Sequence, residues 1–329
     1  MTTAEILTGL RPVTMECFEV FAPYYEERAK HYVYPRYWQS VCYLMWFGNI
    51  YYNIIRAKHG KVLVVYKRTY LFHFGLQMLF MPISLTGSMQ DELSVILAAL
   101  KVGISLRVTT EDINRYRIPR KMVEENKGIS AIAKHKENIV INSSDEFIYQ
   151  AQRGSAMYGS KYRKLRNLTK RITNASGYSL MTGAHPQIEG VVRDWGDHYL
   201  ETHQEKASQL DLYHICKSAP QAYVTIRSIV IGDTLQCFSV LERLAPKQYI
   251  IVQRVRNYHS GQNDVGAAMQ WVDCNAVTDG ATAPVYLNMG MADTGGLIHA
   301  KEALQPCAHQ KIYNFKTNKT SDKLKAYFK

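Results

Sequence analysis

Residues 160–172 read SKYRKLRNLTKRI and lie within a long stretch of the chain that has no acidic residue. No Asp or Glu occurs between Glu146 and Glu189. A solvated helix normally mixes charges, because opposite charges at i,i+4 stabilise it and like charges repel. Leucine and isoleucine recur in this stretch at helical spacing. We therefore expect a helix over residues 160–174 with one apolar and one basic face, ended by Gly177.

The cations of this predicted helix are candidates for binding phosphate groups. A basic surface without acidic residues attracts polyanions such as nucleic acid. The alternative is that the helix covers an acidic surface of the same chain, although few acidic clusters occur elsewhere. The predicted phosphate-binding residues are Lys161, Arg163, Lys164, Arg166, Lys170 and Arg171.

Two separated motifs in the chain are similar to motifs of a known family. The first comprises DEFIY at 145–149 and GSKYRKLRN at 159–167. The second comprises VYLN at 285–288, DTGGLIHAK at 293–301 and then Pro306. With these two motifs in this order, the chain resembles one particular family, whose members are similar to the C-terminal domain of phosphatidylglycerol lysyltransferase.

The resemblance implies both a fold and a chemistry. Proteins of that family are built from two GNAT-type acyltransferase folds in tandem, and they take an aminoacyl group from tRNA. This chain departs from the pattern in a shorter loop between Asp293 and Leu297 and in Ile298, where the family has an Arg. An Arg at such a place could clamp a phosphate or carboxylate bidentately. The resemblance therefore implies an acyl or aminoacyl transferase and leaves the donor and the acceptor open.

The hydrophobic patterns agree with a mixed α/β fold. Helical or helix-like packing segments are expected at 16–30, 37–55, 89–102, 160–174, 186–203, 264–277 and 297–304, with a short helix from Pro119 to about Gly128. Strands are expected at 62–67, 71–81, 104–108, 138–142, 146–150, 178–181, 223–231, 234–244, 248–255, 284–288 and 311–315, and Thr109 or Thr110 is expected to cap a following helix.

The second half has the element order that a GNAT fold needs, namely helix, β-meander, helix and strand. A length of 329 residues allows two domains of about 150 residues each. We expect an N-terminal GNAT-like domain over residues 1–158 and a C-terminal one over 159–316 that carries the basic helix. Residues 317–329 form a basic tail.

Three polar residues of the second motif are the catalytic candidates. Asn288 ends a predicted strand, where α/β proteins place ligands, and its amide can donate and accept hydrogen bonds. Lys301 could bind a phosphate or stabilise an oxyanion, or it is a surface lysine. Asp293 could act as a base toward an attacking amine, or it caps the helix that follows.

The donor is expected to be something other than acetyl-coenzyme A. GNAT acetyltransferases hold the pyrophosphate on backbone N–H groups between a strand and a helix, usually with an R/Q-x-x-G-x-G/A sequence. The matching segment here is RNYHSGQND at 256–264, which has one glycine and in which Asp264 opposes a phosphate. No metal site is predicted: Asp194, His198 and Glu201 share one helical face, but they form no HExxH motif and an ordinary polar face is the simpler interpretation.

The whole-chain composition favours a polyanionic partner. The formal net charge is +12 and the pI is about 9.3. The six cysteines are scattered without a CxxC pair, as in a reduced cytoplasmic protein, and the start of the chain, with Glu5, does not resemble a signal peptide. Residues 37–55 are uncharged but contain polar side chains, so we expect no transmembrane segment.

Three functions remain open from the sequence. The first is a transferase that uses aminoacyl-tRNA. The second is an amino-acid or acyl transferase that modifies DNA bases, as in bacteriophage DNA hypermodification, for which the high positive charge argues. The third is a catalytically silent nucleic-acid-binding protein. The chain has no Walker A sequence and no G-x-S-x-G elbow, which argues against a kinase or a hydrolase.

Overall fold

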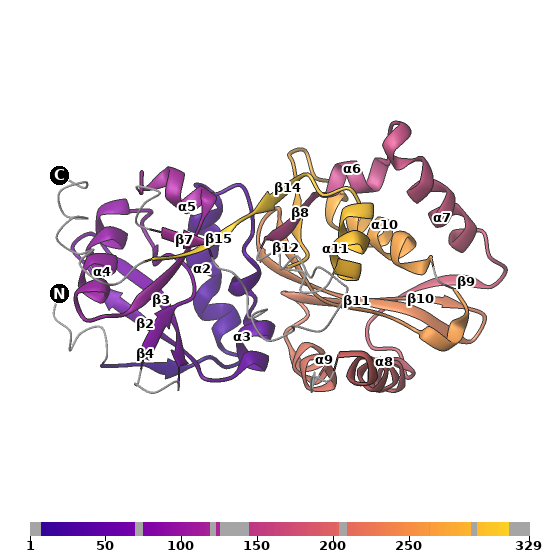
Figure 1. Cartoon of the computed structure of the whole chain (residues 1–329), viewed down its shortest axis with the longest axis horizontal. Coiled ribbons are helices and arrows are strands. Elements are labelled where there is room, and N and C mark those ends of the chain that lie inside the picture. Colours follow the sequence, from indigo (N-terminus) through magenta and orange to yellow (C-terminus); the bar gives the residue numbers. More distant parts are fainter. Residues whose placement is uncertain are drawn as a thin grey trace, which may run out of the picture.

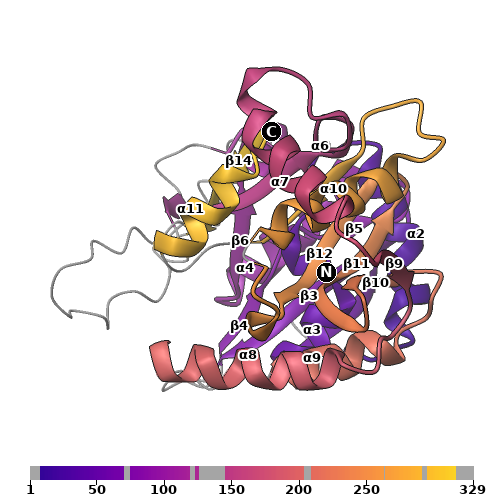
Figure 2. The ribbon, with the colours of Figure 1, turned by 90° about the vertical axis from the view of Figure 1, so that its right-hand side faces the viewer.

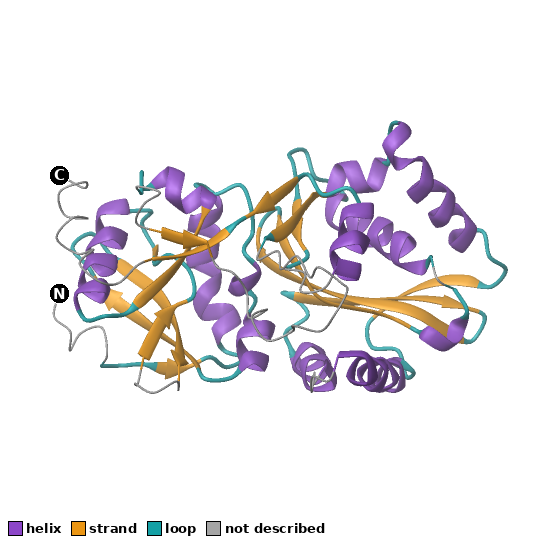
Figure 3. Ribbon diagram, in the orientation of Figure 1, coloured by secondary structure: helices purple, strands orange, loops and turns teal. Residues whose placement is uncertain are grey.

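The computed structural model describes residues 8–69, 75–118, 123–125, 145–203, 209–262, 264–290 and 295–315. These residues form two mixed β-sheets with helices packed on them, and the two sheets follow one another along the long axis of the molecule (Figure 1). Figure 3 shows that strands form the centre of both halves and that helices lie at their flanks.

The first half contains a β-meander followed by a helix and a strand. Its helices are α2 (Cys17–Ala29), η1 (Tyr37–Gln39), α3 (Val41–Phe47), α4 (Met89–Lys101) and α5 (Thr110–Arg115). Its strands are β1 (Arg11–Pro12), β2 (Ile50–Arg56), β3 (Lys61–Thr69), β4 (Gly75–Met78), β5 (Ile83–Ser84), β6 (Ser105–Thr109) and β7 (Val123–Glu125).

The second half repeats this order. Its helices are α6 (Ala151–Ala156), η4 (Ser160–Tyr162), α7 (Arg163–Thr173), α8 (Ile188–His203), α9 (Gln209–Ser218), η5 (Tyr258–Ser260), α10 (Val265–Thr278) and α11 (Gly295–Ala303). Its strands are β8 (Glu146–Gln150), β9 (Tyr178–Thr182), β10 (Val224–Ile231), β11 (Thr234–Ala245), β12 (Gln248–Arg256), β13 (Tyr286–Asn288), β14 (Ala308–Gln310) and β15 (Ile312–Phe315).

Each sheet has one parallel strand pair within an otherwise antiparallel arrangement. The described strands are ordered β1-β2-β3-β4-β6-β15-β7 in the first sheet, where β5 also pairs with β3, and β14-β8-β13-β12-β11-β10-β9 in the second. The parallel pairs are β4 with β6 and β12 with β13, and each pair is joined by a crossover helix, α4 or α10. The fold is therefore mixed α/β with two GNAT-like domains in tandem, as the sequence predicted.

Two strands cross the division that was expected between residues 158 and 159. The strand β8 precedes this point but pairs with β13 and β14 in the second sheet. The strand β15 follows it but pairs with β6 and β7 in the first sheet. The second sheet thus begins before residue 158, at β8, and the end of the chain returns through β15 to the first sheet, which ties the two sheets together.

Most predicted elements are present, and several differ. The expected packing segment 37–55 divides into η1, α3 and the strand β2, because Gly48 and Asn49 both adopt positive φ and end the helix before the β-branched run. Thr109 caps α5, as expected. Residues 123–125 form a strand where a short helix was expected, and α9 and β14 were not predicted. The expected strand at 138–142 and the tail 317–329 lie outside the described residues.

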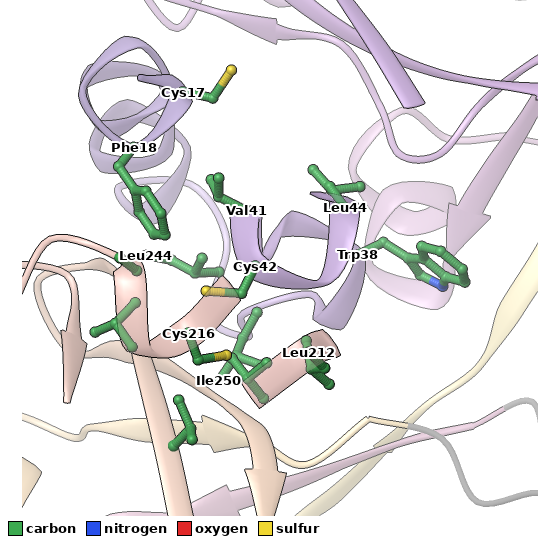
Figure 4. Close-up of a cluster of buried hydrophobic side chains, with 14 of the residues drawn as sticks. Cys17, Phe18, Trp38, Val41, Cys42, Leu44, Leu212, Cys216, Leu244 and Ile250 are labelled. Carbon is green, nitrogen blue, oxygen red and sulfur yellow. The ribbon is translucent and has the colours of Figure 1, made fainter. Parts of the chain in front are cut away.

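A single large apolar cluster connects the two halves. It includes Phe18 and Phe21 of α2 and Leu44 of α3 from the first half, together with Tyr213 of α9 and Phe238 of β11 from the second. Figure 4 shows its central part around α3. Helices α8 and α9 cover one face of the second sheet, and α6, α7 and α10 cover the other (Figures 1 and 2).

The start of α3 is held by a carboxylate from the other half. Glu242 of β11 is 1% exposed and accepts hydrogen bonds from Ser40 Oγ (2.5 Å), Val41 N (2.7 Å) and Cys42 N (3.4 Å). A negative group at a helix N-terminus satisfies free N–H donors and interacts favourably with the helix dipole. Burial nevertheless raises the pKa of Glu242 to about 7, although these hydrogen bonds lower it.

We expect the free energy of unfolding to depend on pH through Glu242. Its pKa is higher in the folded chain than the usual Glu value of about 4.3 in the unfolded chain, so the folded state binds more protons between these values and stability falls as pH rises through this range. Urea unfolding of wild type and Glu242→Gln should show the stability of wild type falling, relative to the variant, by about 2 to 3 kcal/mol between pH 5 and pH 8.

The matched control is Glu26→Gln, which changes an exposed glutamate of α2. Its stability should follow the wild-type pH curve. Parallel curves for Glu242→Gln and wild type would contradict this account of Glu242.

Candidate functional site: the motif turn and the basic helix

The two sequence motifs, far apart in the chain, meet in neighbouring strands. In the antiparallel pair of β8 and β13, Asn288 lies opposite Ile148. Asn288 is 0% exposed, and its Nδ2 donates to Pro35 O (2.7 Å) and to Glu146 Oε2 (2.7 Å). Its Oδ1 accepts from Gly290 N (2.7 Å). Both N–H groups of this amide are therefore engaged, and the one that donates to Pro35 O connects the second sheet to the first half of the chain.

The predicted site residue Lys301 reaches the same turn from α11. Its side chain is buried, and Nζ donates to Met289 O (2.7 Å) and Gly290 O (3.2 Å). The ammonium lies 5.4 Å from the centre of the Phe147 ring. The alternative that Lys301 is a surface lysine is thus excluded, and the structure brings Asn288 and Lys301 together around residues 289–290. We call residues 288–290 the motif turn.

The third predicted catalytic residue, Asp293, lies outside the described residues. In sequence it lies three residues after Gly290, the last residue of the motif turn. Asn288 and Lys301 hold the motif turn itself.

Glu146 is a site residue to which the sequence assigned no role. It is fully buried, and its Oε2 also accepts from Tyr37 N (3.3 Å). Burial raises the pKa of this carboxyl, against the lowering effects of the Arg36 charge and the Asn288 hydrogen bond. Its place in the DEFIY motif was the only signal in the sequence. The carboxyl holds the backbone of the first half against the motif turn.

Tyr37 occupies the place where the parallel strands β12 and β13 diverge. The two strands pair only over Gln248–Ile250 and Tyr286–Asn288. Beyond this, Tyr37 Oη donates to Val252 O (3.1 Å) on the edge of β12. A Cβ added to Gly290 would lie 2.9 Å from Tyr37 ring carbons, so the ring packs directly on the glycine backbone.

We expect Gly290→Ala to destabilise the chain more than a matched glycine change. Gly290 and Gly280 both have positive φ (70° and 68°), but a Cβ at Gly280 meets nothing within 4 Å. Gly280→Ala should cost about 1 kcal/mol for the backbone conformation. Gly290→Ala should cost about 1 to 3 kcal/mol more because of overpacking against Tyr37. Denaturant unfolding compares the two, and equal costs would show that Tyr37 is not packed on the turn.

The predicted basic helix is present as η4 and α7. Leu165 and Ile172 are buried, and α7 packs on α10 through residues of this kind. The opposite face is basic and exposed. Its cations Lys161, Arg163, Lys164 and Lys170 are exposed and make no ion pair with a carboxylate in the described parts of the chain.

Two of the predicted phosphate-binding residues have other partners. Arg166 is half-buried and donates through Nη1 to Met157 O and to Gly159 O (2.8 Å), so it holds the chain before α7. Arg171 forms an ion pair with Asp264. The four remaining cations form what we call the α7 cation face: Lys161, Arg163, Lys164 and Lys170.

The starts of both crossover helices carry acidic residues. Asp264 is the N-cap residue of α10 and pairs with Arg171. The first turn of α4 contains Asp91 and Glu92, and Glu92 accepts from Ser84 N (2.9 Å). A helix N-terminus favours anions, but a carboxylate already placed there opposes a phosphate.

The described residues contain no group of three or more His, Cys, Asp or Glu side chains arranged to hold a metal ion. Within the same residues, no helix combines the length and the apolar character that crossing a bilayer requires. Cys17, Cys42, Cys216, Cys237 and Cys274 are buried as free thiols, and Cys307 is half-buried.

Solved structures with the same fold cover nearly the whole chain. A conserved protein of unknown function from Bacteroides thetaiotaomicron VPI-5482 is similar with a TM-score of 0.66 at 13% identity, covering 94% of this chain and 99% of that one. The L-PGS of Bacillus licheniformis has a TM-score of 0.61 at 14% identity, with 97% and 98% covered. The C-terminal domain of a putative lysylphosphatidylglycerol synthetase from Agrobacterium fabrum has a TM-score of 0.56 at 10% identity, with 95% and 96% covered.

No family model matches the chain, and no curated protein does. At these identities the structural likeness shows the fold. It agrees with the resemblance seen in the two motifs, because one of these structures is the C-terminal domain of a putative lysylphosphatidylglycerol synthetase.

Proposed function

We propose that this chain is an acyl or aminoacyl transferase that works with a nucleic acid, with aminoacyl-tRNA as the donor. The observation that carries the proposal is the α7 cation face on a tandem GNAT-like fold. Its four cations have no carboxylate partner in the described parts of the chain, whereas Arg166 and Arg171 beside them are held by the protein. Cations arranged along one helix face can contact successive phosphates of a nucleic acid backbone.

Two features support a donor other than acetyl-coenzyme A. The start of α10, where a GNAT acetyltransferase would hold the pyrophosphate, carries the Asp264 carboxylate. The second feature is at the open edge of β12, with which an extended ligand could pair as a peptide does in strand addition. Tyr37 Oη already donates to Val252 O on that edge, so this acceptor is occupied by the protein itself.

The proposed chemistry depends mainly on positioning. When an amine or hydroxyl attacks the aminoacyl ester, it must be oriented, it must lose its proton, and the oxyanion that forms must be stabilised. The bond from the carbonyl carbon to the ribose oxygen of the tRNA then breaks, and that oxygen takes up a proton as it leaves. In this proposal Asp293 is the base. Asn288 and Lys301 act as positioning residues, because their polar atoms hold the motif turn, which ends three residues before Asp293 in sequence.

We expect removal of two cations from the α7 cation face to weaken tRNA binding. Lys164→Gln with Lys170→Gln should raise the Kd about tenfold at about 0.1 M salt and reduce the slope of log K against log salt by about 2, because each phosphate contact contributes roughly one unit. Filter binding or fluorescence anisotropy with intact tRNA over a salt series gives both quantities.

The control is Lys58→Gln with Lys101→Gln, two exposed lysines of the first half. It removes the same net charge and should leave both the Kd and the slope near wild type. Equal weakening by the two pairs would show that only net charge matters and would remove the support for the α7 cation face. The same titration with duplex DNA compares the two nucleic acids: stronger binding of duplex DNA would contradict the tRNA proposal and favour modification of DNA bases.

A further inference from the structure

One face of the first sheet carries a row of polar side chains from four neighbouring strands. Lys67 of β3 lies opposite Gln77 of β4, and Arg107 of β6 lies opposite Asn314 of β15. Gln77 Nε2 donates to Asn314 Oδ1 (3.4 Å). These residues alternate with neighbours such as Val108, which belongs to the cluster on the α4 side of the sheet. The row therefore points to the other face, toward the apolar cluster shared by the two halves.

Aromatic rings from η1 and α3 lie against the two cations of this row. The Arg107 guanidinium lies 4.7 Å from the centre of the Trp38 ring, and the Lys67 ammonium lies 3.9 Å from the centre of the Phe47 ring. The two rings meet edge to face, with 5.2 Å between their centres. We call Lys67, Arg107, Trp38 and Phe47 the cation–aromatic cluster.

The cations of this cluster are partly removed from water, and Glu146, whose charge acts on Arg107, lies beyond ion-pair distance. Neither Lys67 nor Arg107 forms an ion pair with any described residue. Burial, and then the charge of Arg107, lower the pKa of Lys67 to about 8, and burial and the charge of Arg36 lower the pKa of Arg107 to about 10. Cation–π contacts offset only about 0.5 to 2 kcal/mol of such a cost.

The cluster and its surroundings also contain buried N–H groups without an acceptor. Trp38 is 3% exposed and Arg36 is 0% exposed. Trp38 Nε1 and Arg107 Nε find no hydrogen-bond partner among the described residues, whereas Arg36 already has a carboxylate, because its Nη1 donates to Asp112 Oδ2 (2.9 Å). Buried donors are normally satisfied, so a group of them in one place indicates a missing acceptor. Since both unsatisfied groups are donors and Arg107 is cationic and acts on Lys67, the acceptor that fits best is an oxyanion, which arginine binds bidentately.

We propose that the cation–aromatic cluster binds the carboxylate or phosphate group of a small molecule between the two halves of the chain. That this molecule is the acceptor of the transferred group rests on the proposed function, whereas binding of the oxyanion does not. The site is distinct from the α7 cation face, which lies on the second half. Binding experiments without tRNA therefore allow the two proposals to fail separately.

The test is isothermal titration of the full chain with inorganic phosphate and, in a separate arm, with malonate. Wild type should bind at least one of them, and Arg107→Gln and Lys67→Gln should each weaken binding at least tenfold. Trp38→Phe, which keeps the ring and removes only the indole N–H, should weaken binding by a smaller factor. Lys61→Gln is the matched control, because Lys61 is an exposed lysine at the other end of β3, and it should bind as wild type.

A pH series with sulfate, which does not titrate in this range, gives a second readout. Lys67 is charged below about pH 8, so the affinity should be constant below that pH and fall by up to tenfold per unit above it. The charged groups that influence this region are Arg107 from β6, Arg36 before η1 and Glu146 from β8. Lys67→Gln should abolish the fall, whereas a fall caused by Glu146 would persist in that variant.

The result separates the possible outcomes. Stronger binding of phosphate supports a phosphoryl group as the natural ligand, and stronger binding of malonate supports a carboxylate. Absence of binding to both anions, or equal binding by wild type, Arg107→Gln and Lys67→Gln, overturns the proposal. Circular dichroism of each variant confirms that it is folded, and Trp38→Phe keeps the test decisive if a charge variant does not fold.

Discussion

The arrangement of the two halves depends on how residues 35–42 dock into the second sheet. This short segment before and into α3 presents a backbone carbonyl and backbone N–H groups to three buried side chains. Asn288 donates to Pro35 O, Glu146 accepts from Tyr37 N, and Glu242 accepts from the first N–H groups of α3. Leaving either buried carboxylate without its donors would cost several kcal/mol. These hydrogen bonds therefore fix the orientation of residues 35–42 on the second sheet as well as stabilising their docking.

This docking explains why the family motif residues are buried. The DEFIY and VYLN segments form adjacent strands, and their polar side chains face the docked segment and the motif turn. The same segment carries Trp38, and with α3 it lies over the polar row of the first sheet, so the cation–aromatic cluster is built from residues of the first half and lies on the face of that sheet where the halves meet. The motif turn and the cluster thus both depend on residues 35–42, while the α7 cation face lies apart on the second half.

The sequence predicts local structure well and strand partners poorly. The basic helix is found where its apolar spacing predicted it, and both crossover helices appear within one residue of the expected bounds. The sheet that β15 joins could not be predicted, because the hydrophobic pattern of a strand shows which of its faces is buried but not which strands it pairs with. For the same reason Lys67 and Arg107 appeared unremarkable: only the pairing of β3, β4 and β6 brings them together. For Lys301 the sequence left a phosphate-binding or oxyanion-stabilising role and a surface position open, and it did not predict that the ammonium donates to backbone carbonyls inside the fold.

The central claim is that a tandem GNAT-like chain with a basic face moves an aminoacyl group from tRNA to a small anionic acceptor. The most direct measurement follows the label of charged tRNA, pooled over the amino acids, in the presence of the protein and a fraction of small metabolites. The account predicts protein-dependent transfer of label to an anionic small molecule, and loss of this transfer when the carrier is uncharged tRNA with free amino acid. Label that stays on tRNA or is released only as free amino acid, at protein concentrations that saturate tRNA binding, would contradict it.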